Sequence, residues 1–262
     1  MIEKNSSDPE DGTQSPRVRD YRYDALPNIT SDEELNDLIA AANSGDVETQ
    51  VILGHMYDVG KYVELSEETA AKWYRMAAEQ GDPEAQYCLG MYLFYEAWDG
   101  NGAYDESFVW LMKSAEQGDA RSQFMVGEFY RKGYGMEESP EEAVKWYRKA
   151  AEQDYSYGIW HHGCAYRDGY GIARSPEEAV RWFRRGVEIG DEASAFTLAE
   201  MYMLGTGIEK SPDKAAEYLT MAAEEHVPIA EYYLGIFYSR GEGVEQSYEK
   251  AAEWMYLAAL HG

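Results

Sequence analysis

Small, apolar and aromatic residues recur along this chain with a period of about 36 residues, and inside each period they follow helical spacing. A small residue stands at Gly54, Gly90, Gly127, Gly163, Ala199 and Gly235, separated by 36, 37, 36, 36 and 36 positions. An aromatic residue recurs in step at Trp73, Trp110, Trp146, Trp182, Tyr218 and Trp254. A fixed period of this length indicates a solenoid, in which each unit buries its apolar face against its neighbours.

Each period predicts two helices, A and B, joined by a short loop. Helix A opens at an Asp such as Asp46 or Asp82, and helix B opens at Ser-Pro-Glu-Glu, as in residues 139–142. Such residues cap a helix N-terminus and complement its dipole. The small residue in the middle of helix A is usually Gly, which costs about 1 kcal/mol relative to Ala. We therefore expect a neighbouring backbone to come close there. The predicted repeats are 46–81, 82–118, 119–154, 155–190, 191–226 and 227–262.

The two ends of the chain differ from the repeats. Residues 1–29 are polar and acidic without helical spacing, so we expect a disordered tail followed by a solenoid over 30–262. Ser31 then starts a lone helix that matches the later B helices, and this helix is predicted to cap the first repeat. At the other end, the pattern stops on a repeat boundary at Gly262. Candidates for an uncovered apolar face there are Ile236, Tyr248, Met255 and Leu257. Either a partner or a second copy of the chain covers this face, or its exposure is tolerated.

These repeated residues resemble the Sel-one-like repeat family, a branch of the tetratricopeptide-like helical repeats. The resemblance covers residues 31–262 and recurs six times. It implies an all-α, right-handed solenoid of six helix hairpins with a concave surface lined mainly by A helices. It also implies an adaptor or assembly role rather than catalysis. Repeat 2 departs from the pattern with Glu96 in place of a loop glycine, repeat 1 with Tyr62, and repeat 4 with His162 in place of an apolar residue.

The chain is strongly acidic, with a formal net charge of -26 over 262 residues. The first 40 residues hold 4 basic and 10 acidic residues, so most of the excess lies in the repeats. The negative electrostatic field of so many acidic residues repels nucleic-acid phosphates and attracts a basic protein surface. The alternative is that the charge only keeps the array in solution.

The compartment predicted from the sequence is the cytoplasm. Only two cysteines are present, Cys88 and Cys164, at different repeat positions, which indicates reduced thiols rather than a disulfide framework. The N-terminus shows no secretory apolar segment, and no apolar run reaches membrane-spanning length.

Few residues suggest catalysis or a cofactor. The adjacent His161 and His162 point about 100° apart on a helix, and Cys164 is the only further ligand type nearby. We predict no metal, cofactor or catalytic residue. The alternative is a hydrolase or small-ligand site in the repeat 4 groove built from these three side chains.

A comparison of the six repeats points to a binding surface. Counted from the central small residue of helix A, the positions -2, +1 and +5 change chemical type from repeat to repeat, and they form one stripe along the helix. Residues that vary in this way are expected to face solvent in a groove, although contact with neighbouring repeats is an equal alternative. The candidate partner-binding residues on or near this stripe are His55, Met91, Tyr95, Glu128, Arg131, Trp160, His161, Arg167, Tyr232, Tyr233 and Arg240.

The sequence therefore favours a non-enzymatic adaptor that binds a protein or peptide in the concave groove. The partner is predicted to be basic, and one specific form is an inhibitor or immunity-type protein of a bacterial cytosol. Two alternatives stay open: the repeat 4 hydrolase or ligand-binding site, and a structural scaffold that self-associates through its C-terminal repeat.

Overall fold

Every predicted repeat folds as a pair of helices in the computed structural model, which describes residues 26–102 and 104–262. Within this part of the chain there are thirteen α-helices and no strand. They are α1 (Asp32–Asn43), α2 (Val47–Val59), α3 (Glu67–Glu79), α4 (Pro83–Trp98), α5 (Tyr104–Glu116), α6 (Ala120–Lys132), α7 (Pro140–Glu152), α8 (Ser156–Asp168), α9 (Pro176–Glu188), α10 (Glu192–Leu204), α11 (Pro212–Glu224), α12 (Pro228–Arg240) and α13 (Tyr248–His261). The even-numbered helices are the A helices, the odd-numbered ones from α3 onward are the B helices, and α1 is the predicted lone helix.

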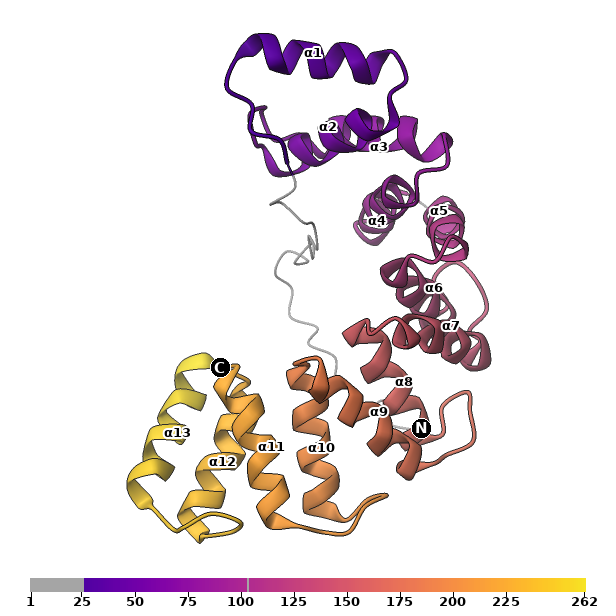
Figure 1. Ribbon diagram of the computed structural model, residues 1–262. Helices are drawn as coiled ribbons and strands as arrows, with labels where there is room; N and C mark the ends of the chain where they lie inside the picture. Colours follow the sequence, from indigo (N-terminus) through magenta and orange to yellow (C-terminus); the bar gives the residue numbers. More distant parts are fainter. Residues whose placement is uncertain (1–25, 103) are drawn as a thin grey trace.

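The helices follow one another along a curved path (Figure 1), with α1 at one end of the arc and α13 at the other. Each helix packs mainly on the helices directly before and after it in the chain. This arrangement confirms the predicted all-α solenoid, in which contacts run between neighbouring repeats. No helix in the described residues is both long enough and apolar enough to cross a bilayer.

The helix starts follow the capping pattern predicted from the sequence. Asp46 accepts a hydrogen bond of 2.8 Å from the amide of Thr49, and Asp82, Asp119 and Asp191 cap α4, α6 and α10 in the same way. Serines cap the B helices α3, α7, α9, α11 and α13. The two A helices that begin after Tyr155 and Val227 have no side-chain cap.

The A helices end at glycines that adopt the left-handed conformation, such as Gly133 with φ of 67°. Repeat 2 differs as its sequence indicated: Glu96 continues α4, which runs to Trp98 and is 16 residues long. A second loop glycine is needed in repeats 4–6 because the loop touches the preceding repeat. A Cβ at Gly171 would lie 2.1 Å from the carbonyl oxygen of Pro140, and Gly207 and Gly243 meet Pro176 and Pro212 in the same way.

The central glycine of helix A lies against the B helix of the same repeat, and both a large side chain and the backbone of that helix are close. A Cβ on Gly235 would lie 3.1 Å from the carbonyl oxygen of Ala251, and one on Gly127 would lie 3.3 Å from that of Ala143. The nearest atoms, however, belong to a B-helix side chain. A Cβ on Gly127 would lie 2.6 Å from the Tyr147 ring, and one on Gly163 would lie 2.6 Å from the ring of Phe183. The absence of a side chain at this glycine leaves room for a B-helix side chain to pack against helix A. A larger residue at this position would overpack the contact and force the two helices of the hairpin apart.

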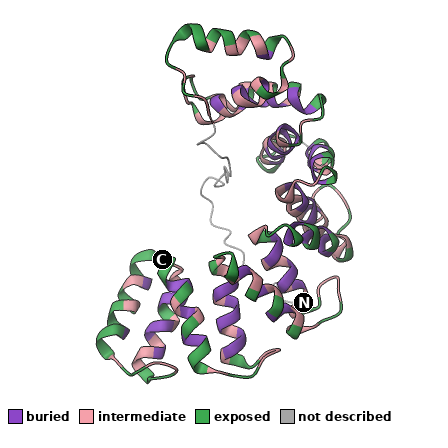
Figure 2. Cartoon of the chain, in the orientation of Figure 1, coloured by how far each residue is buried: buried purple, intermediate pink, exposed green. Residues whose placement is uncertain are grey.

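Burial is greatest in the middle of the array and falls at its ends (Figure 2). In α1 only Ala42 is buried, and in α13 only Ala251 and Ala258 are. Of the predicted uncovered residues, Tyr248 is 72% exposed and Met255 36%, whereas Ile236 and Leu257 are half-buried.

The predicted disordered segment 1–29 lies mostly outside the described residues, which begin at Leu26. Leu26 and Ile29 pack against the small core formed by Ala42, Leu53 and Met56. The end of this segment therefore contacts the first repeat.

Candidate functional site

Three hollows lie along the array, and A helices contribute to each of them. The first, of about 900 Å³, extends across the N-terminal halves of α2, α4 and α6. The second, of about 400 Å³, lies between α8 and the start of α10, and the third, of about 270 Å³, lies between α10, α11 and α12. The candidate site is therefore a series of openings between successive A helices.

The variable stripe predicted from the sequence is mostly half-buried. At positions -2 and +1 most side chains are partly exposed, and at position +5 Asp168, Leu204 and Arg240 are exposed. Cys88 and Thr197 are buried, with 1% and 4% of their surfaces exposed. Met91 is also buried, at 8%, and it belongs to the core of repeats 1–3. A partner therefore has little of the Met91 side chain to contact.

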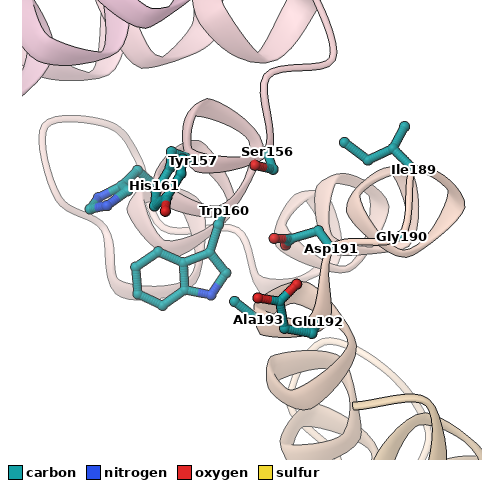
Figure 3. A pocket seen from close by; sticks show the side chains of 9 residues that line it. All are labelled: Ser156, Tyr157, Trp160, His161, Ile189, Gly190, Asp191, Glu192 and Ala193. Atoms are coloured by element: carbon teal, nitrogen blue, oxygen red, sulfur yellow. The ribbon is translucent and has the colours of Figure 1, made fainter. Parts of the chain in front are cut away.

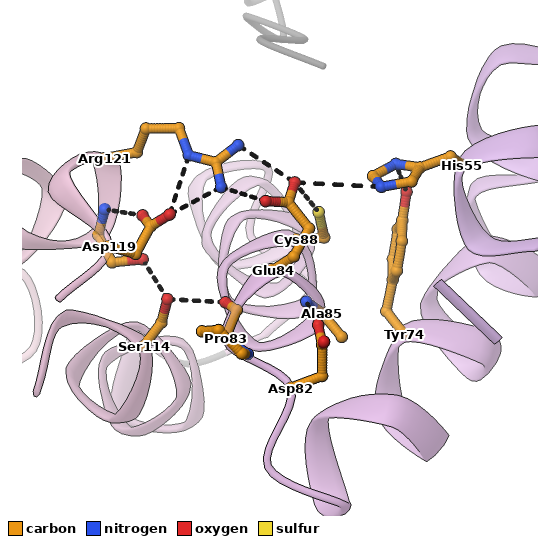
Figure 4. Close-up of polar contacts among 11 residues, drawn as sticks. His55, Tyr74, Asp82, Pro83, Glu84, Ala85, Cys88, Ser114, Asp119 and Arg121 are labelled. Carbon is orange, nitrogen blue, oxygen red and sulfur yellow. Dashed lines mark hydrogen bonds and ion pairs between the residues drawn. The ribbon is translucent and has the colours of Figure 1, made fainter. Parts of the chain in front are cut away.

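The first hollow contains a network of charges around Arg121 (Figure 4). The Arg121 guanidinium donates to both carboxylate oxygens of Glu84 on α4 and to Asp119 at 2.7 Å. It also lies 4.2 Å from the centre of the Tyr87 ring. Arg121 is only 18% exposed, so these contacts hold it in one orientation and link repeats 2 and 3.

His55 lies on the other side of Glu84 in the same hollow. Its Nδ1 is 2.9 Å from the Tyr74 hydroxyl and its Nε2 is 4.0 Å from Glu84. Burial is the main cause that lowers the pKa of His55, against the opposing charge of Glu84. The imidazole is therefore mainly neutral at pH 7, and the hollow keeps an excess of negative charge. The acidic residues that line it are Glu48, Asp82, Glu84 and Asp119.

Glu128, Arg131 and His161 form a second cluster between α6 and α8. Arg131 donates to both carboxylate oxygens of Glu128 at 2.8 and 2.6 Å, the Tyr147 hydroxyl donates to the same carboxylate, and His161 Nδ1 lies 3.8 Å away. Burial alone would raise the pKa of Glu128, but the hydrogen bonds from Arg131 and the nearby charges hold it below its usual value. Two predicted site residues thus neutralise each other, and they are available to a partner mainly as a rigid pair.

The second hollow brings Trp160 and His161 together (Figure 3). Trp160 donates its indole N–H to Thr197 on α10 at 3.0 Å, and its ring meets His161 edge-on at 4.9 Å. Tyr157, which is 52% exposed, lies on the same wall opposite the turn formed by Ile189–Ala193. This hollow therefore offers aromatic surface beside the acidic side chains of Asp191 and Glu192.

Tyr233 and Arg240 line the third hollow with Ile236 and Lys210. Tyr232 is next to this group, 51% exposed, with its ring 5.9 Å from that of Tyr233.

The last two candidates lie outside all three hollows. Arg167 is paired with Asp168 at 2.7 Å. Tyr95 is half-buried against Phe94.

The repeat 4 side chains of the hydrolase alternative point in different directions. His162 is 1% exposed and its ring meets Trp182 at 4.8 Å, whereas His161 packs against Phe124 and Tyr147. Burial lowers the pKa of both histidines to about 4 and raises that of the Cys164 thiol to about 12. At neutral pH the thiol is therefore protonated, which makes it a poor nucleophile and a poor metal ligand.

One row of site residues was missed by the sequence comparison. Glu48, Glu84, Arg121 and Tyr157 all stand six positions before the central small residue, and they line the first and second hollows. Position -6 lies one helical turn before position -2, so it continues the same stripe. The signal was present, because this position changes from Glu to Arg to Tyr between repeats.

Comparisons with known proteins agree with this architecture. The family model described as Sel1 repeat matches residues 47–82, 83–119, 120–155, 156–191, 193–226 and 228–262. Among curated protein sequences, none matches the chain significantly.

Two solved structures are similar over most of the chain. One is a protective antigen of uropathogenic Escherichia coli with an SLR fold, 31% identical over 90% of this chain with a TM-score of 0.82. This chain covers 49% of that protein, and so spans about half its length. The other is a Sel1 repeat protein of Oxalobacter formigenes, 28% identical over 88% of this chain and 67% of that one, with a TM-score of 0.78.

Proposed function

Because this chain belongs to the Sel1 repeat family, whose members are generally non-enzymatic scaffolds for protein–protein interactions, we propose that it binds a basic protein segment along its A helices. One observation carries the proposal: the three hollows are lined by stripe positions whose chemistry differs between repeats. Packing alone would favour the same residue in every repeat, as at the central glycine. A surface that varies between units suits an extended, non-repeating ligand.

The charge of the first hollow supports a basic ligand. Four carboxylates line it, and its one arginine is already paired with two of them. A Lys or Arg side chain entering beside Glu48 would meet a carboxylate that makes no ion pair with any of the described residues. The second hollow suits an apolar or aromatic side chain next to that charge, because Tyr157 and Trp160 form its wall.

The charge argument is tested with a matched pair of variants. Glu48→Lys reverses a charge in the first hollow, and Glu141→Lys makes the same change in the first turn of α7, outside the hollows. Both residues are exposed. We expect a partner retained from a native-host extract to bind the Glu48→Lys variant roughly tenfold more weakly, about 1.4 kcal/mol, and the Glu141→Lys variant as tightly as wild type. Binding should also weaken as the NaCl concentration rises from about 0.1 M to about 0.5 M, because the added salt screens attraction between exposed charges.

The aromatic wall is tested separately with Tyr157→Ala, against Tyr256→Ala on α13 as control. Tyr256 is 69% exposed and lies outside the three hollows. Loss of an anchoring ring should weaken binding by about tenfold or more, while the control should bind normally. Equal binding by the two groove variants and their controls would show that the partner uses another surface.

A further inference from the structure

We propose that a transition-metal ion, with zinc as the best match, binds where repeats 5 and 6 meet, between His226, Glu231 and His261. This site goes beyond the proposed protein binding and uses none of its residues. His226 follows α11, Glu231 lies on α12, and His261 is the last residue of α13. One nitrogen of each histidine and one carboxylate oxygen lie within 4.8 Å of one another.

The first support comes from the contacts among the three side chains. His261 Nδ1 lies 2.8 and 3.1 Å from the two carboxylate oxygens of Glu231, and His226 Nδ1 lies 3.7 Å from the same carboxylate. Tetrahedral zinc with bonds of about 2.1 Å separates its donor atoms by roughly 3.4 Å. Small rotations of the two imidazoles would therefore bring all three donors to binding distance.

The second support is that each of the three residues departs from the internal pattern of the array. Glu231 stands where repeats 1–3 have Gln50, Gln86 and Gln123, and His261 stands where they have Gln80, Gln117 and Gln153. In those repeats the two glutamines hydrogen bond to each other, as Gln80 does to Gln50 at 2.8 Å. A neutral amide pair thus satisfies the fold at this place. Repeat 6 replaces both amides by metal-ligating side chains.

The third residue, His226, occupies a position that favours glycine. It has φ of +61°, and the equivalent residues of other repeats include Gly81, Gly118 and Gly190 with φ of 98°, 103° and 85°. The left-handed backbone conformation is less favourable for histidine than for glycine, so we expect a contact of the His226 side chain to compensate. Asp154, the other non-glycine at this position, has one in its ion pair with Arg185 at 2.6 Å. For His226 the described contacts are with Glu231 and His261.

The environment also suits a cation. The Glu231 side chain is fully buried, and His261 supplies the polar partner that a buried carboxylate requires. A cation bound beside it would add the positive charge that balances the carboxylate. Two histidines and one glutamate form a known zinc ligand set that leaves a fourth position open. His226 is 71% exposed, so this fourth position would face solvent and accept water or a donor from another molecule.

The site would have a structural effect on one of the two sparsely buried ends of the array. Metal bonds from α12, α13 and the end of α11 would join the terminal helix, with its two buried residues, to its neighbours. The other described group of ligand-type residues, His55, Glu84 and Cys88, is less suitable, because Glu84 is paired with Arg121 and His55 with Tyr74.

The test is a calorimetric titration of the full chain with zinc chloride. The protein carries no polyhistidine tag and is first treated with a chelator to remove bound metal. We expect one equivalent of zinc per chain. The variants Glu231→Gln, His261→Gln and His226→Gly restore the residues that the chain itself uses in other repeats, so they are expected to fold, which circular dichroism verifies. Each should bind zinc at least about tenfold more weakly, and the triple variant should bind none. The control variant His55→Gln should bind as wild type does.

Hydrogen exchange supplies a second, local measurement. Zinc should slow amide exchange in α12 and α13 of the wild-type protein and leave exchange in the triple variant unchanged. The proposal is overturned if the wild-type chain binds no zinc, if the triple variant binds it equally tightly, or if bound zinc protects another region.

Discussion

His162 occupies a position that the other five repeats fill with an aliphatic residue: Leu53, Leu89, Val126, Leu198 and Leu234. It is 1% exposed, and its Nδ1 has no hydrogen-bond partner in the described residues. Burial, followed by the charge of Arg148, lowers its pKa to about 4, while Glu152 acts in the opposite direction. The fold therefore contains a neutral imidazole where the pattern requires only an apolar group.

This residue makes stability depend on pH. In the unfolded chain a histidine titrates near pH 6.5, so between about pH 6.5 and pH 4 the unfolded state binds a proton that the folded state excludes. The free energy of unfolding should thus fall as pH decreases through this range, by up to about 1.4 kcal/mol per pH unit for this group. We predict that His162→Leu reduces this dependence and makes the variant more stable than wild type at pH 5. Chemical denaturation at pH 7.5 and pH 5 measures both. His161 and the carboxylates remain in both proteins, so an identical pH profile for the two would contradict the assignment.

At the scale of the helix, local sequence signals determine where each element begins and ends. An Asp side chain caps four of the six A helices, and serines cap the B helices for which a cap is described. Such a cap stabilises a helix by about 0.5–2 kcal/mol. The contribution matters most near the ends of the array, where few side chains are buried.

We predict that Asp46→Ala loosens α2 in particular. Asp46 is exposed, and its side chain accepts the amide hydrogen bond of Thr49. Loss of about 1 kcal/mol should speed amide exchange in α2 roughly fivefold. Asp37→Ala, an equal loss of charge in the interior of α1, serves as control, because Asp37 caps no helix. Equal exchange rates in α2 of the two variants would show that capping by Asp46 contributes nothing measurable.

The helices, their order and their caps could be predicted from the sequence because they depend on residues within one or two turns. The site was less predictable, since it depends on how one repeat is placed on the next. Of the stripe residues, His161 and Tyr233 line hollows, whereas Met91 on the same stripe is buried. Whether they bind a partner stays a prediction. The proposed zinc ligands His226, Glu231 and His261 were missed because each looks like an isolated residue until it is aligned with the glycine and glutamine positions of other repeats.

Over the whole molecule, the net charge of -26 opposes compaction of the array. Most ion pairs that the structure does contain are local, such as Arg131 with Glu128 and Arg148 with Glu152. They leave the long-range repulsion between acidic residues in place. Stability should therefore depend on ionic strength.

We predict that raising the salt concentration from about 20 mM to about 500 mM increases the thermal unfolding midpoint, because the Debye length falls to a few ångströms. Sodium and potassium chloride should give the same increase if screening is the cause. Differential scanning calorimetry measures the midpoint. An unchanged or lower midpoint at high salt would mean that local ion pairs outweigh the long-range repulsion.

The contact between the second loop glycine and the preceding proline also restricts the order of the repeats. Units 4, 5 and 6 each bring a glycine against a proline, so their loops are interchangeable at this junction. Repeat 1 has Tyr62 at the corresponding place, with φ of 66°, and its hydroxyl donates to Asn28 at 3.2 Å. If repeat 1 followed a repeat whose B helix begins with proline, the Tyr62 side chain would clash with the backbone of that proline. Repeat 1 therefore does not fit behind a repeat of this kind. Repeats 4, 5 and 6 carry glycine at this contact, so an array can lengthen by duplication of these repeats without the clash.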